Sequence, residues 1–518
     1  MSRILNGTCL AAFLAAAFLT CTTAFAAGEL KFEDAMGRLG FADPGYGWHS
    51  YHDAIVCCDW DQDGDADILV VTSLHEKGPL GSQGRLYVNL LKETGKLAFE
   101  DRTEKLMPDG INKKMIADGC PFFFDVNNDG RLDLCSITDE GQPTTFINEG
   151  GKFRLEPWGF NAQSCTIKDT NGDGLLDVIG NDTGMLYINE GKGKFRGGKL
   201  EGGLSGHMPR DKVLPTPEGI RVDDEAKKLA AGTGHVYYFW SKLDINGDGQ
   251  PDYQLSLSQA YGFKLLRFYV KTDAGFRDFT AETGLPTNVE VHFMDLNGDG
   301  KTDAVTGGTN AGGVYLGDGK GHFKAAPPSD ANKVFSITLG GCYTAPQAVV
   351  DFNNDGTLDI LAYEYRAGAG SALLRGLEEG RYESVLKTGA GSGQVVADLN
   401  ADGLLDIVSS GPSESKGVHV WMNASGGNGH WLAVCPRGPE KNPFAVNASV
   451  EVYRPGKLGQ SDALLARGTA RSDGMPVHLG LGPCNTVDLR VTFSPGVVKE
   501  LKDVKTDRVL PVSLRKAE

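Results

Sequence analysis

A nine-residue pattern with acidic or amide side chains at positions 1, 3, 5 and 9 and a glycine at position 6 occurs seven times in this chain of 518 residues. The first copy, Asp59 to Asp67, reads Asp-Trp-Asp-Gln-Asp-Gly-Asp-Ala-Asp and is followed directly by Ile-Leu-Val-Val. A hard cation such as Ca²⁺ takes about six to eight oxygen ligands, and a short loop supplies them where a glycine permits a sharp turn. The pattern therefore predicts seven metal-binding loops.

The predicted ligands are positions 1, 3, 5, 7 and 9 of each loop. They are Asp59, Asp61, Asp63, Asp65 and Asp67 in loop 1; Asp125, Asn127, Asp129, Arg131 and Asp133 in loop 2; Asp169, Asn171, Asp173, Leu175 and Asp177 in loop 3; Asp244, Asn246, Asp248, Gln250 and Asp252 in loop 4; Asp295, Asn297, Asp299, Lys301 and Asp303 in loop 5; Asp351, Asn353, Asp355, Thr357 and Asp359 in loop 6; and Asp398, Asn400, Asp402, Leu404 and Asp406 in loop 7.

The loops begin like an EF-hand loop but differ from it at the end. The last acid comes at position 9 instead of 12, and strand-forming residues follow it, so each loop is expected to join two strands. A solvated turn is the alternative for any one loop, because Asp, Asn and Gly are common turn residues. Seven loops with the same oxygen pattern favour a metal, and Ca²⁺ over Mg²⁺, because Mg²⁺ prefers to keep several waters.

The charge of the chain agrees with bound cations. The formal net charge is −16 with a pI near 5.2, and no cluster of five or more Lys or Arg appears, so nucleic acid is not expected as a partner. Without residues 1–26, whose single charge is Arg3, the net charge is −17; seven dications would add +14 and leave about −3. We therefore expect metal to stabilise the folded state.

The first 26 residues read as a secretory signal peptide. Arg3 precedes an apolar run from Cys9 to Leu19, and Ala24-Phe25-Ala26 provides a cleavage site before Ala27. The alternative is a retained membrane anchor, but the apolar run is shorter than the roughly 20 residues that span a bilayer. No other stretch predicts a span, so the mature chain is expected in the periplasm, on the cell surface or outside the cell.

Eight cysteines remain after cleavage: Cys57, Cys58, Cys120, Cys135, Cys165, Cys342, Cys435 and Cys484. An even number outside the cell permits disulfides, although eight cysteines allow about 105 pairings. The expected pair is Cys435 with Cys484, because both fall in the C-terminal domain. Small buried side chains are the alternative for the others.

The seven loops begin 44 to 75 residues apart, and each is followed by a short apolar strand and a second strand that ends in a turn. Four strands in each interval would form a blade, and seven blades a propeller. Some blades then continue with Phe-x-Asp-x-Thr, as at Phe99, and a variant at Phe32 precedes the first loop. Residues 30–34 are therefore expected to supply the outer strand of blade seven and close the ring.

The loops and their flanking strands resemble the FG-GAP/VCBS repeats of calcium-bearing β-propellers, which integrin α-chains also carry, over about residues 30–424. From Gly429 the chain resembles the ASPIC/UnbV domain that follows such repeats in the cartilage acidic protein family. The segments that carry this likeness are Gly429-His-Trp-Leu, Asn447-Ala-Ser-Val, His478-Leu-Gly-Leu-Gly and Val491-Thr-Phe-Ser-Pro-Gly. The resemblance implies an all-β chain with a seven-bladed propeller at 27–424, about seven Ca²⁺ ions, and a small β-sandwich at 425–518.

Two insertions interrupt the repeats. Residues 197–240 include an expected short helix at 223–229, and residues 72–85 form a Gly/Ser-rich loop. Loops on a rigid scaffold are common binding sites, so the larger insertion is either a lid on the propeller face or a surface elaboration without a ligand.

No catalytic or cofactor-binding residue is assigned, because no Gly-x-Ser-x-Gly, His-Glu-x-x-His or phosphate-binding loop appears. Tyr46, Trp48, His49, Tyr51 and His52 cluster before loop 1. They would line a sugar site or hold a transition metal, or else take part in ordinary packing.

Two functions stay open. The favoured one is a secreted calcium-binding module for adhesion or structure with a protein or glycan partner, because every recognisable cluster is a metal loop. The alternative is a secreted calcium-dependent lyase or hydrolase that acts on polysaccharide, which needs a base near a cation-bound uronate. His49, His52 and His207 are the candidates for that base.

Overall fold

The computed structural model describes residues 29–35, 37–41, 54–72, 83–108, 121–137, 143–162, 165–180, 185–199, 205–207, 213–232, 236–259, 263–307, 312–336, 344–364, 372–387, 393–410, 418–427, 429–494 and 496–514. The predicted signal peptide, the aromatic and histidine cluster at 46–52 and most of the Gly/Ser-rich loop at 72–85 lie outside these residues. Across the described chain, no helix is long and apolar enough to cross a membrane.

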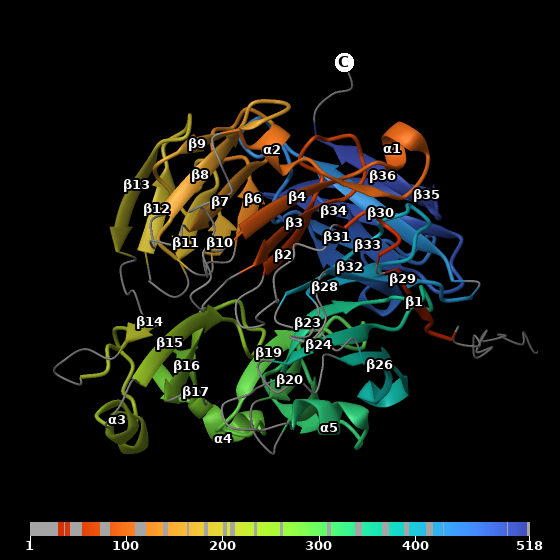
Figure 1. The fold of residues 1–518 in the computed structure, drawn as a ribbon. Helices are drawn as coiled ribbons and strands as arrows, with labels where there is room; N and C mark the ends of the chain where they lie inside the picture. The colour runs from red at the N-terminus through yellow and green to blue at the C-terminus, as the bar shows by residue number, and fades with distance from the viewer. Residues whose placement is uncertain are drawn as a thin grey trace, which may run out of the picture.

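The repeats fold into seven antiparallel sheets that follow one another around a ring (Figure 1), which confirms the predicted propeller. The first three blades consist of β2 (Ala54–Cys58), β3 (Asp67–Thr72), β4 (Gln83–Asn89) and β5 (Phe99–Asp101); β6 (Phe122–Phe124), β7 (Asp133–Ile137), β8 (Pro143–Asn148) and β9 (Phe153–Glu156); and β10 (Cys165–Lys168), β11 (Asp177–Gly180), β12 (Met185–Asn189) and β13 (Phe195–Lys199).

Blades four to seven repeat the order, with an extra strand in blade four. They consist of β14 (Ser205–His207), β15 (Val236–Leu243), β16 (Asp252–Gln259), β17 (Phe263–Thr272) and β18 (Gly275–Asp278); β19 (Glu290–Met294), β20 (Asp303–Gly307), β21 (Gly313–Gly317) and β22 (Phe323–Ala325); β23 (Thr344–Val350), β24 (Asp359–Glu364), β25 (Ala372–Gly376) and β26 (Tyr382–Lys387); and β27 (Gln394–Ala397), β28 (Asp406–Ser410), β29 (Val418–Asn423) and β1 (Phe32–Asp34).

Short helices fill some of the connections. They are α1 (Leu91–Thr94), α2 (Thr103–Leu106), α3 (Asp224–Ala230), α4 (Thr280–Thr283), α5 (Asp330–Phe335) and the 3₁₀ turns η1 (Glu378–Gly380) and η2 (Ser461–Ala463).

Strand β3 shows why the apolar runs after the loops pack as they do. Ile68 and Val70 lie in a hydrophobic cluster with residues of blade seven, whereas Leu69 and Val71 lie in a cluster with residues of blade two. Successive side chains of a strand point to opposite faces, so a continuous apolar run satisfies both neighbouring blades.

The ring closes as predicted through the N-terminal strand. Strand β1 pairs antiparallel with β29, with Phe32 opposite Asn423, and the Phe32 ring lies 5.8 Å from that of Phe352 in blade six. Blade seven therefore combines residues from both ends of the repeat region.

The described part of the large insertion packs against blade four. Helix α3 confirms the expected helix, and Asp223 caps its N-terminus, where its Oδ1 accepts the N–H of Ala226 at 2.7 Å. Arg267 of β17 is 8% exposed and donates to Asp223 at 2.6 Å and to Glu225 at 2.5 Å. The apolar side chains Ile220 and Ala226 extend the hydrophobic cluster of this sheet, so residues 213–232 cover blade four.

After the propeller, two sheets face each other and confirm the predicted sandwich. They contain β33 (Val477–Gly480), β30 (Trp431–Arg437) and β36 (Arg508–Ser513), and β32 (Leu464–Thr469), β31 (Ser449–Tyr453), β34 (Thr486–Phe493) and β35 (Val497–Lys505). Their inner faces share one core, in which Val434 and Leu479 of the first sheet meet Val452 and Leu489 of the second.

The sandwich lies on the face of the propeller that carries the loops, and we call it the cap. Figure 1 shows its blue strands against the ring. Contacts to five loops fix this position. Lys441 O accepts from Asn128 of loop 2 at 3.0 Å, and Lys441 Nζ donates to Asp173 O of loop 3 at 2.6 Å. Arg467 lies 3.4 Å from Asp295 of loop 5, His478 lies 3.1 Å from Asn354 of loop 6, and Trp431 lies on Gly403 of loop 7.

Apolar side chains of the cap also enter the propeller core. Phe444 is 6% exposed and shares a hydrophobic cluster with Trp60 and Leu132 of blades one and two, and Met475 packs against a cluster of blades one and seven. Burial of a phenylalanine side chain contributes about 1.5–3 kcal/mol. The two domains therefore share core as well as surface.

The expected disulfide between Cys435 and Cys484 is wrong, because both are free thiols. On β30, Val434 points into the sandwich core, and Cys435, the next residue, points the other way; burial raises the pKa of its thiol, and Asp59 of loop 1 raises it further. Cys484 packs against the sandwich core instead. Side chains on opposite faces of a sheet do not meet. The other described cysteines, Cys57, Cys58, Cys135 and Cys165, are free as well.

Deletion of residues 28–36 tests ring closure. Loss of β1 exposes the backbone edge of β29, so we expect a lower melting temperature and aggregation that increases with protein concentration. Differential scanning calorimetry and light scattering measure both effects, with the exposed substitution Lys31→Ala as the control. A soluble deletion variant as stable as this control would contradict the closure.

Gly480→Ala tests the docking of the cap on loop 6. A Cβ atom at Gly480 would lie 1.9 Å from Asp351 Oδ2, so β33 has to move away. We expect a loss of about 1–3 kcal/mol in stability and faster proteolysis between propeller and cap. Gly426→Ala is the matched control, because a Cβ there meets nothing within 4 Å. Equal melting and equal cleavage patterns for the two variants would refute this contact.

Candidate metal centres

Every predicted loop joins two consecutive antiparallel strands of its blade, as the sequence indicated. Loop 2 shows the geometry that the loops share. Asp125 accepts the N–H groups of Asp129 at 3.0 Å and Gly130 at 2.8 Å. Asn127 Oδ1 accepts the N–H of Asp129 at 2.9 Å, and Asp129 Oδ1 accepts that of Arg131 at 3.0 Å. Positions 1, 3 and 5 are thus drawn together by backbone donors of the same loop.

The glycine at position 6 is required by its backbone conformation. Its φ is positive in all seven loops, between 79° and 95°, and its N–H donates to the aspartate at position 1 in loops 2 to 7. An L-residue with a side chain seldom adopts this conformation, so the glycine fixes the turn that brings positions 1 and 5 together.

The aspartate at position 9 lies buried beneath each loop. In loop 2, Asp133 accepts the N–H of Val126 at 3.1 Å with one oxygen and the N–H of Asn148 in β8 at 2.8 Å with the other. The same two bonds recur in loops 3 to 7. One donor is the N–H of the residue at position 2, and the other is an N–H at the end of the strand that follows the one beginning at position 9. Position 9 therefore ties its loop to its blade.

The seventh residue of each loop, which was also predicted as a ligand, belongs to the same turn. Its N–H donates to the carboxylate at position 5 in all seven loops, at 2.7 to 3.0 Å. The structure thus brings all five predicted positions of each loop into one turn of nine residues.

Burial without a charged partner raises the pKa of many of these carboxyl groups. It raises the pKa of Asp133 and Asp406 to about 8 and that of Asp359 to about 7. It also raises the pKa of Asp125 and Asp398 to about 6. Backbone N–H donors oppose this effect, and neighbouring carboxylates add to it. A cation is the kind of partner that keeps such groups ionised at neutral pH.

Several loops already contain partners for part of their charge. The amide of the asparagine at position 3 donates to the carboxylate at position 5 in loops 2, 3, 4, 6 and 7, at 2.9 to 3.1 Å. In loop 2 the guanidinium of Arg131 lies 2.5 Å from Asp129, and in loop 5 Lys301 Nζ lies 2.8 Å from Asp299. The amides therefore hydrogen-bond carboxylate oxygens, and the two basic groups neutralise them, without a metal.

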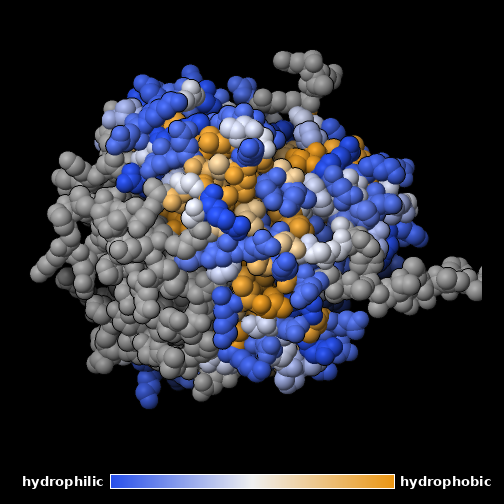
Figure 2. Space-filling view, turned by 45° about the vertical axis from the view of Figure 1, so that its right-hand side comes forward, coloured by the Kyte–Doolittle hydropathy of each residue, from blue (hydrophilic) through white to orange (hydrophobic). Residues whose placement is uncertain are grey.

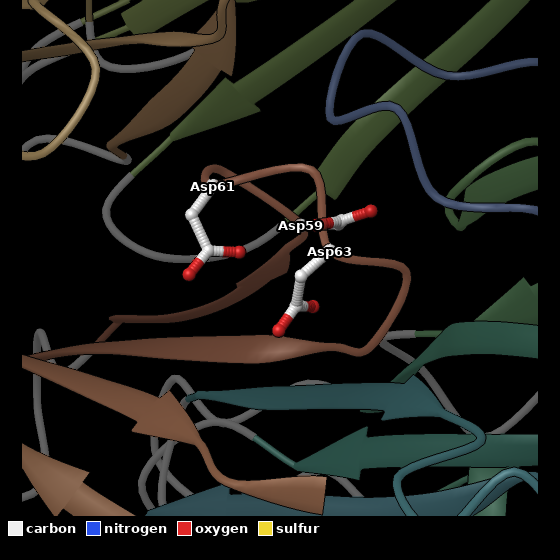
Figure 3. Close-up of side chains that lie close together, drawn as sticks. All are labelled: Asp59, Asp61 and Asp63. Carbon is white, nitrogen blue, oxygen red and sulfur yellow. The ribbon is translucent and has the colours of Figure 1, made fainter. Parts of the chain in front are cut away.

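Loop 1 lacks such partners. Its position 3 is Asp61, and carboxylate oxygens of Asp59, Asp61 and Asp63, which project from one loop (Figure 3), lie within 4.8 Å of one another. Asp59 Oδ1, Asp65 Oδ1 and Asp67 Oδ2 are buried and have no hydrogen-bond partner. These residues fit a hard cation, because oxygens buried without a donor are costly and a cation satisfies them.

Sequence reasoning missed two groups beside the loops. Glu93 of α1 contributes an oxygen within 4.8 Å of oxygens of Asp63 and Asp65. Arg467 of the cap reaches loop 5 from β32. The sequence also shows acidic residues in the turns after β8 and β12, at Glu149 and Glu190. It does not show which of these turns lies beside its loop.

The candidates for catalysis receive no support from the described residues. His49 and His52 lie outside them, and His207 is described only as a backbone position in β14.

Comparisons with known proteins agree with this architecture. A family model described as an FG-GAP-like repeat matches residues 125–180 and 295–362, and a model described as ASPIC and UnbV matches residues 438–518. The first covers loops 2, 3, 5 and 6, and the second covers most of the cap.

The curated relatives are cartilage acidic proteins. Human cartilage acidic protein 1 is 29% identical over 251 residues, which are 44% of this chain and 37% of that protein. The mouse protein is 28% identical over 248 residues, or 44% of this chain and 38% of that protein. The chain therefore matches less than half the length of these relatives.

A solved structure of an Agrocybe aegerita lectin that recognises non-reducing terminal N-acetylglucosamine is also similar, with a TM-score of 0.36 and 18% identity over 66% of this chain and 81% of that chain. Loops 2, 3, 5 and 6 of this chain are thus similar to FG-GAP-like repeats, most of the cap is similar to an ASPIC and UnbV domain, and 44% of the chain is similar to human cartilage acidic protein 1.

Proposed function

We propose that this chain is an extracellular calcium-binding module that is held rigid by its loops and binds a protein or glycan partner. The observation that carries the metal part is the set of buried oxygens without partners in loop 1, on Asp59, Asp65 and Asp67. The likeness to cartilage acidic protein 1 over part of its length supports the extracellular setting.

Ca²⁺ fits the loops better than other common cations. All predicted side-chain ligands are carboxylate or amide oxygens, which suit hard cations, and none is the thiolate or imidazole that transition metals prefer. The loops also hold much of the negative charge of a chain whose net charge is −16. Bound dications would reduce the repulsion among them.

The position of the cap supports a structural role for the metal. In loop 6, Asp351 and Asn353 are each 4% exposed, and β33 of the cap lies against Asp351 at Gly480. A cation at this loop would be enclosed between the two domains, where it stiffens their junction. A catalytic cation needs an open coordination position for substrate instead.

The surface offers places for a partner. A cleft of about 670 Å³ lies between blades five and six and the cap, where Tyr382, Arg467 and His478 line it. Hydrophobic residues also gather near the middle of one side of the molecule, with hydrophilic residues around them (Figure 2). Apolar surface with a polar border is typical of protein-binding sites.

Protonation of the buried carboxyl groups competes with calcium binding, so the pH dependence of stability tests whether the loops bind calcium. A carboxyl group whose pKa is raised on folding favours the folded state below its unfolded pKa of about 4, and this advantage is lost as pH rises through its folded pKa. For Asp133 and Asp406 that pKa is about 8. We expect metal-stripped protein to lose stability between about pH 4 and 8.

Calcium should reverse this loss, so the rise in melting temperature on adding Ca²⁺ should grow from pH 5 to pH 8. Thermal unfolding of metal-stripped protein with and without CaCl₂ measures it, and MgCl₂ at the same ionic strength is the control. A calcium effect that is independent of pH, or equal to that of Mg²⁺, would contradict the assignment.

Partner binding is tested with the mature chain on an array of neutral and acidic glycans and on immobilised extracellular-matrix proteins. We expect retention that needs Ca²⁺ and leaves the glycans intact, because the metal stiffens the binding surface without taking part in chemistry. Cleavage of an acidic polysaccharide with new unsaturated ends would instead establish the enzyme alternative.

A further inference from the structure

Loop 1 carries more acid than any other loop. It is the single loop with aspartate at both position 3 and position 7; the residues at position 7 elsewhere are Arg131, Leu175, Gln250, Lys301, Thr357 and Leu404. Blade one also has a helix, α1, in the turn after its third strand. This helix brings Glu93 to the loop, so six carboxylates meet there.

The carboxylates form two groups that share one residue. Oxygens of Asp59, Asp61 and Asp63 lie within 4.8 Å of one another, and so do oxygens of Asp63, Asp65 and Glu93. The first group consists of positions 1, 3 and 5 of the loop. The second group shares Asp63 with the first, and the described residues of the remaining loops form no such acidic group.

Asp65 is the group that points to a ligand in the second cluster. It is 7% exposed, its Oδ2 accepts the N–H of Lys92 at 3.0 Å, and its Oδ1 is buried without any hydrogen-bond partner. A buried carboxylate oxygen that lacks a donor costs free energy, and a cation removes that cost.

Glu93 is held more loosely than the acidic residues of comparable turns. Glu149 lies 2.6 Å from Arg154, and Glu190 lies 3.1 Å from Arg196. The nearest basic group to Glu93 is Arg102 at 3.5 Å, and Arg102 binds Glu100 more closely, at 2.6 Å. Glu93 therefore keeps oxygen capacity for a metal.

Charge supports two ions instead of one. The six carboxylates of loop 1 and α1 carry a formal charge of −6, so one dication leaves −4 and two leave −2. The ammonium of Lys92, which lies beside Gly64, and the guanidinium of Arg102 offset the remainder.

We propose that loop 1 binds a pair of divalent cations of the calcium class, with Asp63 as the bridging carboxylate. Asp59 and Asp61 complete the first site, and Asp65 and Glu93 complete the second. The first ion of the pair rests on the proposed calcium function. The second ion goes beyond that function. Carboxylate-bridged ions in proteins lie about 3.5–4 Å apart.

Native mass spectrometry of the calcium-loaded mature protein and electron paramagnetic resonance of the manganese-loaded protein test this pair. Glu93→Gln should bind one ion fewer than the unmodified chain, and the signal of two strongly interacting Mn²⁺ ions should disappear. Asp65→Asn should do the same. Glu104→Gln removes an exposed carboxylate of α2, outside the cluster, and this variant should bind as many ions as the unmodified chain.

Two results would overturn the pair in different ways. If the unmodified chain shows no interacting Mn²⁺ ions and Glu93→Gln keeps the ion count, loop 1 holds one ion and the second site is wrong. If substitution of both Asp59 and Asp61 by asparagine also leaves the ion count unchanged, loop 1 holds no ion, and the proposed calcium function loses the observation that carries it.

Discussion

The buried aspartate at position 9 is the interaction on which the propeller depends. In loops 2 to 7 both of its oxygens accept backbone N–H groups, one at the start of the loop and one at the end of the third strand. Hydrogen bonds to a charged group contribute about 1.5–3 kcal/mol each, whereas a buried carboxylate without donors is strongly destabilising. Each blade therefore joins its loop and hairpin through one side chain.

This arrangement separates two tasks within the same nine residues. Position 9 and the glycine at position 6 set the backbone, so the loop has its shape from hydrogen bonds alone. Positions 1, 3 and 5 then face the space where a cation would lie. The loops are consequently not equivalent: Arg131 and Lys301 neutralise carboxylates in loops 2 and 5, whereas loop 1 keeps three buried carboxylate oxygens without hydrogen-bond partners.

The cap depends on the loops in turn. Gly480 allows β33 to approach Asp351, and Phe444 fills a cluster shared with Trp60 and Leu132. The basic side chains of Lys441 and Arg467 lie against acidic loops. These basic side chains offset part of the negative charge of the loops that they contact.

The sequence by itself determined the repeating architecture: seven loops between strands, closure of the ring by the strand at Phe32, the helix after Asp223 and a sandwich after Gly429. These features follow from short patterns, because the donors and acceptors of a loop lie within about ten residues of each other and apolar alternation is a local property. Only the tertiary structure decided where the cap lies, that Cys435 and Cys484 stay apart, and that Glu93 meets Asp65. Those outcomes depend on contacts between side chains that are distant in the chain or on the face of a sheet that each side chain takes, and spacing in the sequence does not specify either.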